Sequence, residues 1–271
     1  MNIKEYYEYG RRELPDPTEC VLLTEKFFGK TRKDIAVNPE WTPENGAEFL
    51  AAVQRRKQGT PLQYILGYWF FCGMELSLTP GVLVPREDTM ALVETAAAFI
   101  RKQKYRGLDL CAGTGAVALG LASLCENATV TAVELFPKPL ACLRQNCARY
   151  GKGRVSVQED DVLYPHGTYA NLDFIVSNPP YIPAEEIASL QKEVQQEPRE
   201  ALDGGGDGLD FYRVIASRWA KCLRPGGMLA VEIGDTQAPV VTALLENTGI
   251  MDIRLVKDMN GKPRTLWGKR K

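Results

Sequence analysis

This 271-residue sequence has only one histidine, His166. Its seven cysteines are scattered and include no Cys-x-x-Cys pair. Zinc sites need such ligands in clusters, so the sequence predicts no metal. A disulfide scaffold is typical of smaller, secreted domains, so we expect reduced thiols. Both expectations favour a cytoplasmic protein.

Long apolar runs and an excess of either charge are also missing. No segment reaches the roughly 18 apolar residues that cross a bilayer, and the charged, aromatic N-terminus lacks the apolar core of a signal peptide. The 33 basic and 34 acidic residues leave a net charge of -1, so the chain as a whole does not attract the phosphate backbone of nucleic acid. We expect no membrane association and no stable nucleic-acid binding.

The chain divides by pattern into three parts. Residues 1–71 have the pattern of short helices separated by glycine and proline, which predicts a small helical domain. Residues 72–88 are rich in aromatic and β-branched residues broken by glycine and proline, which suggests a hairpin-like connector. In residues 89–271, after a helix at about 88–103, apolar strands alternate with helices. This alternation predicts an α/β fold, a Rossmann-like, doubly wound and mostly parallel sheet covered on both faces.

A basic run, Arg55-Arg56-Lys57, falls at the end of a predicted helix in the first part. Cations in the last turn of a helix complement its macrodipole. We therefore expect a solvated helix end here, and not a binding patch for an acidic partner.

Three features stand at the ends of predicted strands, where open α/β sheets bind ligands. The first is a glycine-containing turn between a strand and an apolar helix, made of Cys111, Ala112, Gly113, Thr114 and Gly115. The second is Glu134, whose carboxylate could accept hydrogen bonds from both hydroxyls of a ribose. The third is Asp161, which could accept from an adenine amino group. In strand order, the three features predict a nucleoside site.

The turn after the predicted strand 172–177 has the sequence Asn178-Pro179-Pro180-Tyr181. Its two prolines remove two backbone donors and fix the chain direction, so a rigid turn keeps its carbonyl groups free to accept. Asn178 adds a side-chain oxygen and Tyr181 adds a flat aromatic face. Such a turn could hold a planar NH2 group through both of its hydrogens.

Methylation of an amide or of an exocyclic amine has these requirements, because the nitrogen lone pair is delocalised and is a poor nucleophile. S-adenosylmethionine is an activated methyl donor, so the reaction needs in-line positioning and dispersal of charge more than it needs a strong base. The near absence of histidine agrees with this. The sequence predicts a methyltransferase that converts S-adenosylmethionine to S-adenosylhomocysteine.

Several stretches then identify a family. They are 61–67, 82–86, 178–182, 197–213, 223–234 and 258–264. Together they resemble the HemK-type release factor glutamine methyltransferases over most of the chain from residue 61 onward. Residues 1–60 match only as a short helical prelude.

The resemblance implies N5-methylation of the glutamine in the Gly-Gly-Gln motif of peptide chain release factors. It implies that the loop 111–115 wraps the methionine part of the cofactor, that Glu134 binds the ribose, and that Asp161 with Val162 binds the adenine. Asn178, Pro179, Pro180 and Tyr181 would hold the substrate glutamine, with Asn178, Pro179 and Tyr181 as the catalytic group and Asn178 also at the cofactor. The domain 1–71 would grip the release factor.

The sequence departs from the family pattern at Cys111, where glycine is usual, and at Glu134, where aspartate is usual. It also has Pro85-Arg86-Glu87-Asp88-Thr89 in place of Pro-Arg-Pro-Glu-Thr. Cys111 requires either an ordinary negative φ or some tolerated strain. Glu134 is one methylene longer and should still reach a ribose, while Val162 offers adenine less contact than an aromatic residue, so we expect intact but weaker cofactor binding.

Other functions remain open at this point. An adenine-N6 methyltransferase of DNA or RNA faces the same geometric problem, but should carry a basic face. A glutamine methyltransferase of a ribosomal protein could share the acceptor motif, and a catalytically silent binding module should have lost the glycines, Glu134 or Asn178. The glycine-rich segment 203–208 is either a mobile lid over the acceptor site or a plain connection.

Overall fold

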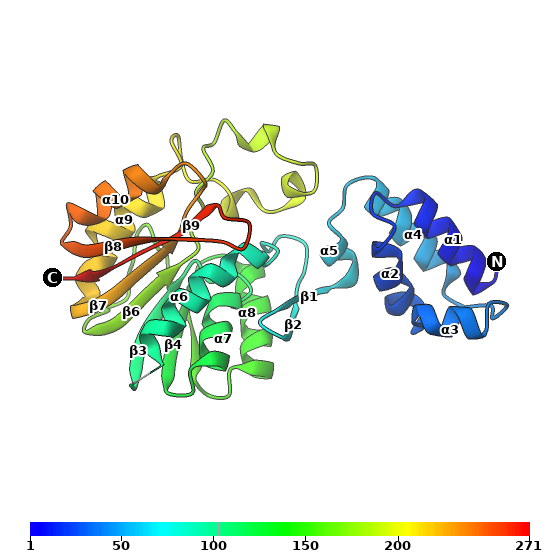
Figure 1. Cartoon of the computed structure of the whole chain (residues 1–271), viewed down its shortest axis with the longest axis horizontal. Coiled ribbons are helices and arrows are strands. Elements are labelled where there is room, and N and C mark those ends of the chain that lie inside the picture. Colours follow the sequence, from blue (N-terminus) through cyan, green and yellow to red (C-terminus); the bar gives the residue numbers. More distant parts are fainter. Residues whose placement is uncertain (102) are drawn as a thin grey trace. The chain divides into compact units, whose positions relative to one another are not determined.

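The computed structural model describes residues 1–101 and 103–271, and it divides into two compact units (Figure 1). One unit contains Met1–Tyr68 and Gln191–Gln196, and the other contains Trp69–Leu190 and Glu197–Lys271. The sequence pattern predicted a helical domain 1–71, a connector 72–88 and an α/β domain 89–271. In the structure the first unit ends at Tyr68 and also includes a short segment from late in the chain.

The N-terminal unit is helical. Its elements are α1 (Ile3–Glu13), α2 (Glu19–Phe28), α3 (Arg32–Val37), α4 (Gly46–Lys57), α5 (Leu62–Leu66) and the 3-10 turn η3 (Val194–Gln196). Its core is aromatic: the fully buried Phe49 ring stacks on Phe28 with 4.9 Å between ring centroids and meets Tyr6 edge-on at 5.8 Å. Such contacts let three short helices, α1, α2 and α4, bury one shared cluster.

The expectation of a solvated helix end at Arg55-Arg56-Lys57 holds for Arg55 and Lys57, which are exposed, and is wrong for Arg56. Arg56 is only 8% exposed, and its guanidinium binds both carboxylate oxygens of Glu19, at 2.6 and 2.8 Å. A third bond, 2.9 Å long, joins it to Glu193 in the late segment of this unit. The planar fork of arginine suits such bidentate pairing, and the last turn of α4 faces α2, so this cation is internal.

The second unit begins with a hairpin and contains one large sheet. The hairpin pairs β1 (Tyr68–Phe71) with β2 (Met74–Ser77). The strands of the large sheet are β3 (Tyr105–Leu110), β4 (Ala128–Glu134), β5 (Val155–Glu159), β6 (Leu172–Ser177), β7 (Leu223–Glu232), β8 (Ile250–Lys257) and β9 (Pro263–Arg270). Their order is β5-β4-β3-β6-β7-β9-β8, with parallel pairing from β5 to β7 and antiparallel pairing at β9.

Helices cover both faces of this sheet. Figure 1 shows α6 (Met90–Ile100), α7 (Ala116–Leu124) and α8 (Pro137–Tyr150) on one face, and α9 (Asp210–Ser217) and α10 (Ala238–Glu246) on the other. The prediction of a doubly wound, mostly parallel sheet is therefore confirmed. The predicted helix 88–103 includes residue 102, which lies outside the described residues. The 3-10 turn η5 (Trp219–Cys222) follows α9.

Three further 3-10 turns lie in the loops of this unit. They are η1 (Glu87–Thr89), η2 (Ile187–Ser189) and η4 (Arg199–Ala201). Within the described residues, no helix has the length and apolarity needed to cross a membrane.

β3 pairs with β4 on one side and with β6 on the other, both in parallel. The strand order therefore reverses at β3, which opens a crevice at the carboxyl ends of these three strands.

Candidate functional site

The crevice holds a cavity of about 320 Å³. Of the residues predicted for the site, those that line it are Cys111, Gly113, Glu134, Asp161, Val162, Asn178 and Pro180. Ala112 and Thr114 line a smaller cavity of about 40 Å³, which shares Cys111, Gly113 and Asn178 with the larger one. Gly115, Pro179 and Tyr181 belong to the same turns but lie outside both linings.

The turn after β3 depends on left-handed backbone at three of its five residues. Gly113 has φ +56° and Gly115 has φ +83°. A Cβ at Gly115 would lie 2.6 Å from Leu143 Cδ1 in α8, so a side chain there would have to displace the buried Leu143. Cys111 has φ +59°. Of the two possibilities for this residue, an ordinary negative φ or tolerated strain, the structure therefore has tolerated strain.

Glu134, at the end of the neighbouring strand β4, holds the turn after β3 in place. Its carboxylate is 7% exposed and accepts from the backbone N–H groups of Leu135, Phe136 and Gly113, at 2.8, 3.0 and 2.9 Å. The first two bonds go to Oε1 and the third to Oε2. A carboxylate has about four acceptor positions, so one stays available on Oε2. Binding both hydroxyls of a ribose would require Glu134 to exchange one backbone bond.

Two adjacent aspartates follow β5, and they differ in their role. Asp161 lines the cavity, and its Oδ1 accepts from Leu163 N at 2.7 Å. Asp160 also lines the cavity and accepts four hydrogen bonds, from Asp161 N, His166 N, Gly167 N and the Tyr169 hydroxyl. Burial alone would raise the pKa of Asp160, but these bonds lower it to about 2. Sequence reasoning missed Asp160, because only the fold shows which of two neighbouring carboxylates turns inward.

Apolar side chains that the sequence analysis did not single out form the remaining walls of the larger cavity. They are Leu83, Val133, Leu135, Phe136, Pro139, Leu163 and Phe211. Leu135 and Phe136 are 39% and 37% exposed, high for large apolar side chains. In the sequence, only their position directly after Glu134 could have indicated that Leu135 and Phe136 line the site. An apolar cavity with a few carboxylates suits a flat ring joined to polar hydroxyls.

The acceptor turn continues the buried strand β6. Ser177 Oγ donates to Leu110 O at 2.8 Å, which fixes the turn to β3. Asn178 Nδ2 donates to Thr89 Oγ1 at 3.2 Å, and Gln237 Nε2 donates to Tyr181 O at 2.9 Å. Burial raises the pKa of the Tyr181 phenol to about 12, so this group stays protonated at neutral pH and cannot act as a general base.

Two segments that the sequence analysis did not connect meet at the rim. The buried carboxylate of Glu197 accepts from Val84 N at 2.9 Å and forms an ion pair with Arg86. Burial is the largest influence on Glu197 and raises its pKa, while Arg86 opposes this rise. The ion pair ties the connector, which carries Leu83, to the segment that carries Glu200 and Asp203, and all three of these residues line the cavity.

The glycine-rich segment 203–208 packs against the acceptor turn. Gly204 N donates to Ile182 O at 2.9 Å, and Ile182 N donates to Leu202 O at 2.9 Å. A Cβ at Gly208 would lie 2.4 Å from Tyr181 O, so the two segments approach more closely than a side chain permits. These contacts give the glycines a packing reason, and motion of a lid stays a prediction.

The described residues include no group of three or more histidine, cysteine, aspartate or glutamate side chains arranged to hold a metal ion. Each of the seven cysteines is a free thiol.

The fold, the glycine turn and the crevice define a class, and family models agree with it. Residues 88–218 match the family described as "Methyltransferase small domain", and residues 15–67 match "PrmC N-terminal domain". A methyltransferase structure from Pyrococcus furiosus has a similar fold, with a TM-score of 0.56, 20% sequence identity, and coverage of 73% of this chain and 89% of that one. The chain is a methyltransferase.

Curated relatives narrow the class. A release factor glutamine methyltransferase from Geobacter sulfurreducens is 43% identical over 93% of this chain and 88% of the relative. One from Gloeobacter violaceus is 39% identical over 93% of this chain and 90% of its own length. The chain belongs to the release factor glutamine methyltransferase family, as the sequence motifs indicated.

Proposed function

We propose that this protein transfers a methyl group from S-adenosylmethionine to the side-chain amide nitrogen of the glutamine in the Gly-Gly-Gln motif of peptide chain release factors. One observation carries the proposal. The amide of Asn178, on a proline-rigidified turn, borders both the larger cavity and the glycine turn, so an acceptor held by Asn178 meets a ligand held by that turn. Family membership supports the same acceptor.

The residues of the larger cavity fit S-adenosylmethionine. Glu134 keeps an acceptor position for a ribose hydroxyl, and Asp161 with Val162 borders the apolar part of the cavity, where an adenine ring fits. A Cβ on Gly113 would meet no atom within 4 Å, so this backbone is open to a ligand. S-adenosylmethionine supplies a methyl group on a positively charged sulfur, which needs no metal ion for activation.

The protein's own groups then have a positioning task. Asn178 Oδ1 and a carbonyl oxygen of the proline turn, with Pro179 the first choice, accept the two N–H bonds of the substrate amide. This holds its nitrogen lone pair toward the glycine turn and disperses the positive charge that develops on nitrogen. Tyr181 stays neutral and packs beside the substrate, and Pro180 forms part of the wall.

We also propose that the N-terminal unit contacts the release factor and that the reaction takes place in the cytoplasm. The family model for residues 15–67 supports a role for this unit that is specific to the family. The free thiols are consistent with a reducing compartment. The near-neutral charge of the chain argues against stable binding to nucleic acid.

Parallel incubations with labelled S-adenosylmethionine test the proposal. The acceptors are a release factor, the same factor with its Gly-Gly-Gln glutamine changed to alanine, a ribosomal protein preparation and duplex DNA. We expect label only on the intact release factor. Label on DNA would move the function to an adenine methyltransferase, and label on a ribosomal protein alone would move it to another glutamine.

A further inference from the structure

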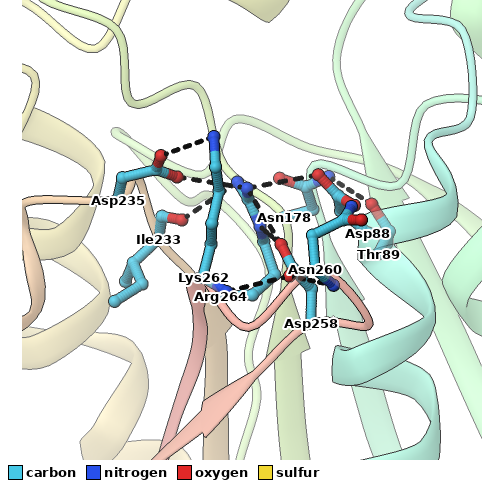
Figure 2. A network of polar contacts seen from close by, with 9 residues as sticks. All are labelled: Asp88, Thr89, Asn178, Ile233, Asp235, Asp258, Asn260, Lys262 and Arg264. Atoms are coloured by element: carbon cyan, nitrogen blue, oxygen red, sulfur yellow. Dashed lines mark hydrogen bonds and ion pairs between the residues drawn. The ribbon is translucent and has the colours of Figure 1, made fainter.

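Behind the acceptor turn, polar side chains from three separate elements meet. Asn178 Nδ2 donates to Thr89 Oγ1 in η1 at 3.2 Å. Figure 2 shows the two side chains close together. Glu232, at the end of β7, follows Val231, which is the register partner of Ser177, so Glu232 lies beside Asn178 at the ends of neighbouring strands. The Thr89 side chain also acts on Glu232 and lowers its pKa. Thr89 is 4% exposed and Glu232 is 2% exposed, and Glu232 Oε2 has no hydrogen-bond partner among the residues that the structure describes.

The chemistry of these groups sets the direction of their hydrogen bonds. A side-chain amide can turn either its oxygen or its NH2 group toward Thr89, and a hydroxyl can donate or accept. An ionised carboxylate can only accept. If Glu232 is ionised, Thr89 donates to it and offers Asn178 only a lone pair, so Asn178 Nδ2 faces Thr89 and Oδ1 faces away from it.

An ion-pair cluster around the buried Arg264 helps to fix Thr89 in place. In Figure 2, Arg264 lies between Asp88, Asp235 and Asp258, with N···O distances of 3.2, 3.2 and 3.3 Å. Asp88 directly precedes Thr89 in η1, so its pair with Arg264 holds the turn that presents the hydroxyl. This cluster connects the tail loop before β9 to the back of the acceptor turn.

We propose that Thr89 and Glu232 are positioning residues that orient the Asn178 amide, so that Asn178 Oδ1 points at the NH2 group of the substrate. The inference rests on the proposed function for the identity of that NH2 group. The opposite orientation would present two N–H donors of Asn178 to two N–H donors of the substrate, which cannot bond to each other.

The orientation of the Asn178 amide should depend on pH, because it depends on whether Glu232 is ionised. Burial raises the pKa of Glu232 to about 7, although Thr89 and the nearby cations oppose the rise. When Glu232 is protonated, its O–H can donate to Thr89, whose hydroxyl can then donate to Asn178 Oδ1 and so favour the wrong orientation. The other ionisable groups that act on Glu232 or are acted on by it are Arg264, Asp88, Arg86, Tyr181 and Tyr212.

Steady-state kinetics with a release factor test this arrangement. Thr89→Val should lower kcat roughly 10-fold and leave the KM for S-adenosylmethionine unchanged, whereas Thr89→Ser should retain most of the activity. The control is Thr248→Val, which removes a hydroxyl that donates to Leu245 O at 2.9 Å outside the linings of both cavities and should leave kcat unchanged. In an Asn178→Ala background, Thr89→Val should cause no further loss.

The pH profile separates positioning from a merely structural role. In the wild type, kcat should rise with pH through about 7 as Glu232 ionises. Glu232→Gln cannot ionise, so its kcat should lose that rise. Wild-type kcat in Thr89→Val, or losses that add fully in the Asn178→Ala background, would overturn the inference.

A second measurement does not depend on the substrate. In protein labelled with ¹⁵N at asparagine, the side-chain NH2 signals of Asn178 are the pair that Asn178→Ala removes. They should titrate with an apparent pKa of about 7 in the wild type and stop titrating in Thr89→Val. Signals that ignore both pH and Thr89→Val would overturn the positioning, whatever is methylated. Normal titration without methylation of any release factor would instead overturn the proposed function.

Discussion

Changing Asp160 to asparagine should destabilise the protein, because the two oxygens of Asp160 each accept two hydrogen bonds. Asp161 N and His166 N donate to Oδ1, and Gly167 N and the Tyr169 hydroxyl donate to Oδ2. An asparagine keeps one oxygen, and its NH2 group would face two donors. The loss of two bonds to a charged group and the donor contacts left behind should cost about 2–4 kcal/mol in the free energy of unfolding.

The lowered pKa of Asp160 gives a second value for the free energy by which its carboxylate stabilises the folded protein. A pKa lowered from 3.8 to about 2 corresponds to about 2 kcal/mol of stabilisation. Because the folded protein binds this proton more weakly than the unfolded chain, the stabilisation is complete above about pH 4. It is lost as the pH falls toward about 2.

Urea denaturation followed by circular dichroism, at neutral pH and at a series of acid pH values, measures both effects. The matched control is Asp161→Asn, since Asp161 accepts from Leu163 N through one oxygen that an amide retains. We expect a change below about 1 kcal/mol for this control. Equal stability of Asp160→Asn and Asp161→Asn at neutral pH, or identical acid dependence of Asp160→Asn and the wild type, would refute the reasoning.

Three further changes test the site. Gly115→Ala should lower stability by about 1–3 kcal/mol in thermal or urea unfolding, because its φ is +83° and its Cβ would lie 2.6 Å from Leu143 Cδ1; an unchanged midpoint would contradict the packing. Cys111→Gly should relieve about 1 kcal/mol of left-handed strain, partly offset by the greater freedom of glycine in the unfolded chain, so the midpoint of thermal unfolding should stay equal or rise; a lower midpoint would contradict the strain. Asn178→Ala should lower turnover roughly 100-fold and spare most of the cofactor affinity, and an almost fully active variant would remove Asn178 from its assigned role.

The sequence predicted those parts of the fold and of the site that depend on local pattern. Apolar strands alternating with helices indicate a parallel sheet, and polar residues at strand ends then share one edge of it. Glu134 and Asn178 were found in this way, because each directly follows or ends a buried strand. Both line the same cavity in the structure.

The residues that were missed act through contacts distant in sequence. Thr89 meets Asn178 across 89 positions, and Arg56 meets Glu193 across 137. No local periodicity encodes such pairs, since tertiary packing decides them. The same holds for Asp160, whose difference from Asp161 lies only in the direction of its side chain and the loop that wraps it.

The central claim is that the glutamine of the Gly-Gly-Gln motif receives the methyl group on its side-chain nitrogen. The direct test is peptide mass spectrometry of a release factor after incubation with the purified protein and S-adenosylmethionine, with Asn178→Ala as the control enzyme. The account predicts the mass of one added methyl group on that glutamine, and little or none with Asn178→Ala. A methyl group on another residue, or equal modification by both enzymes, would contradict it.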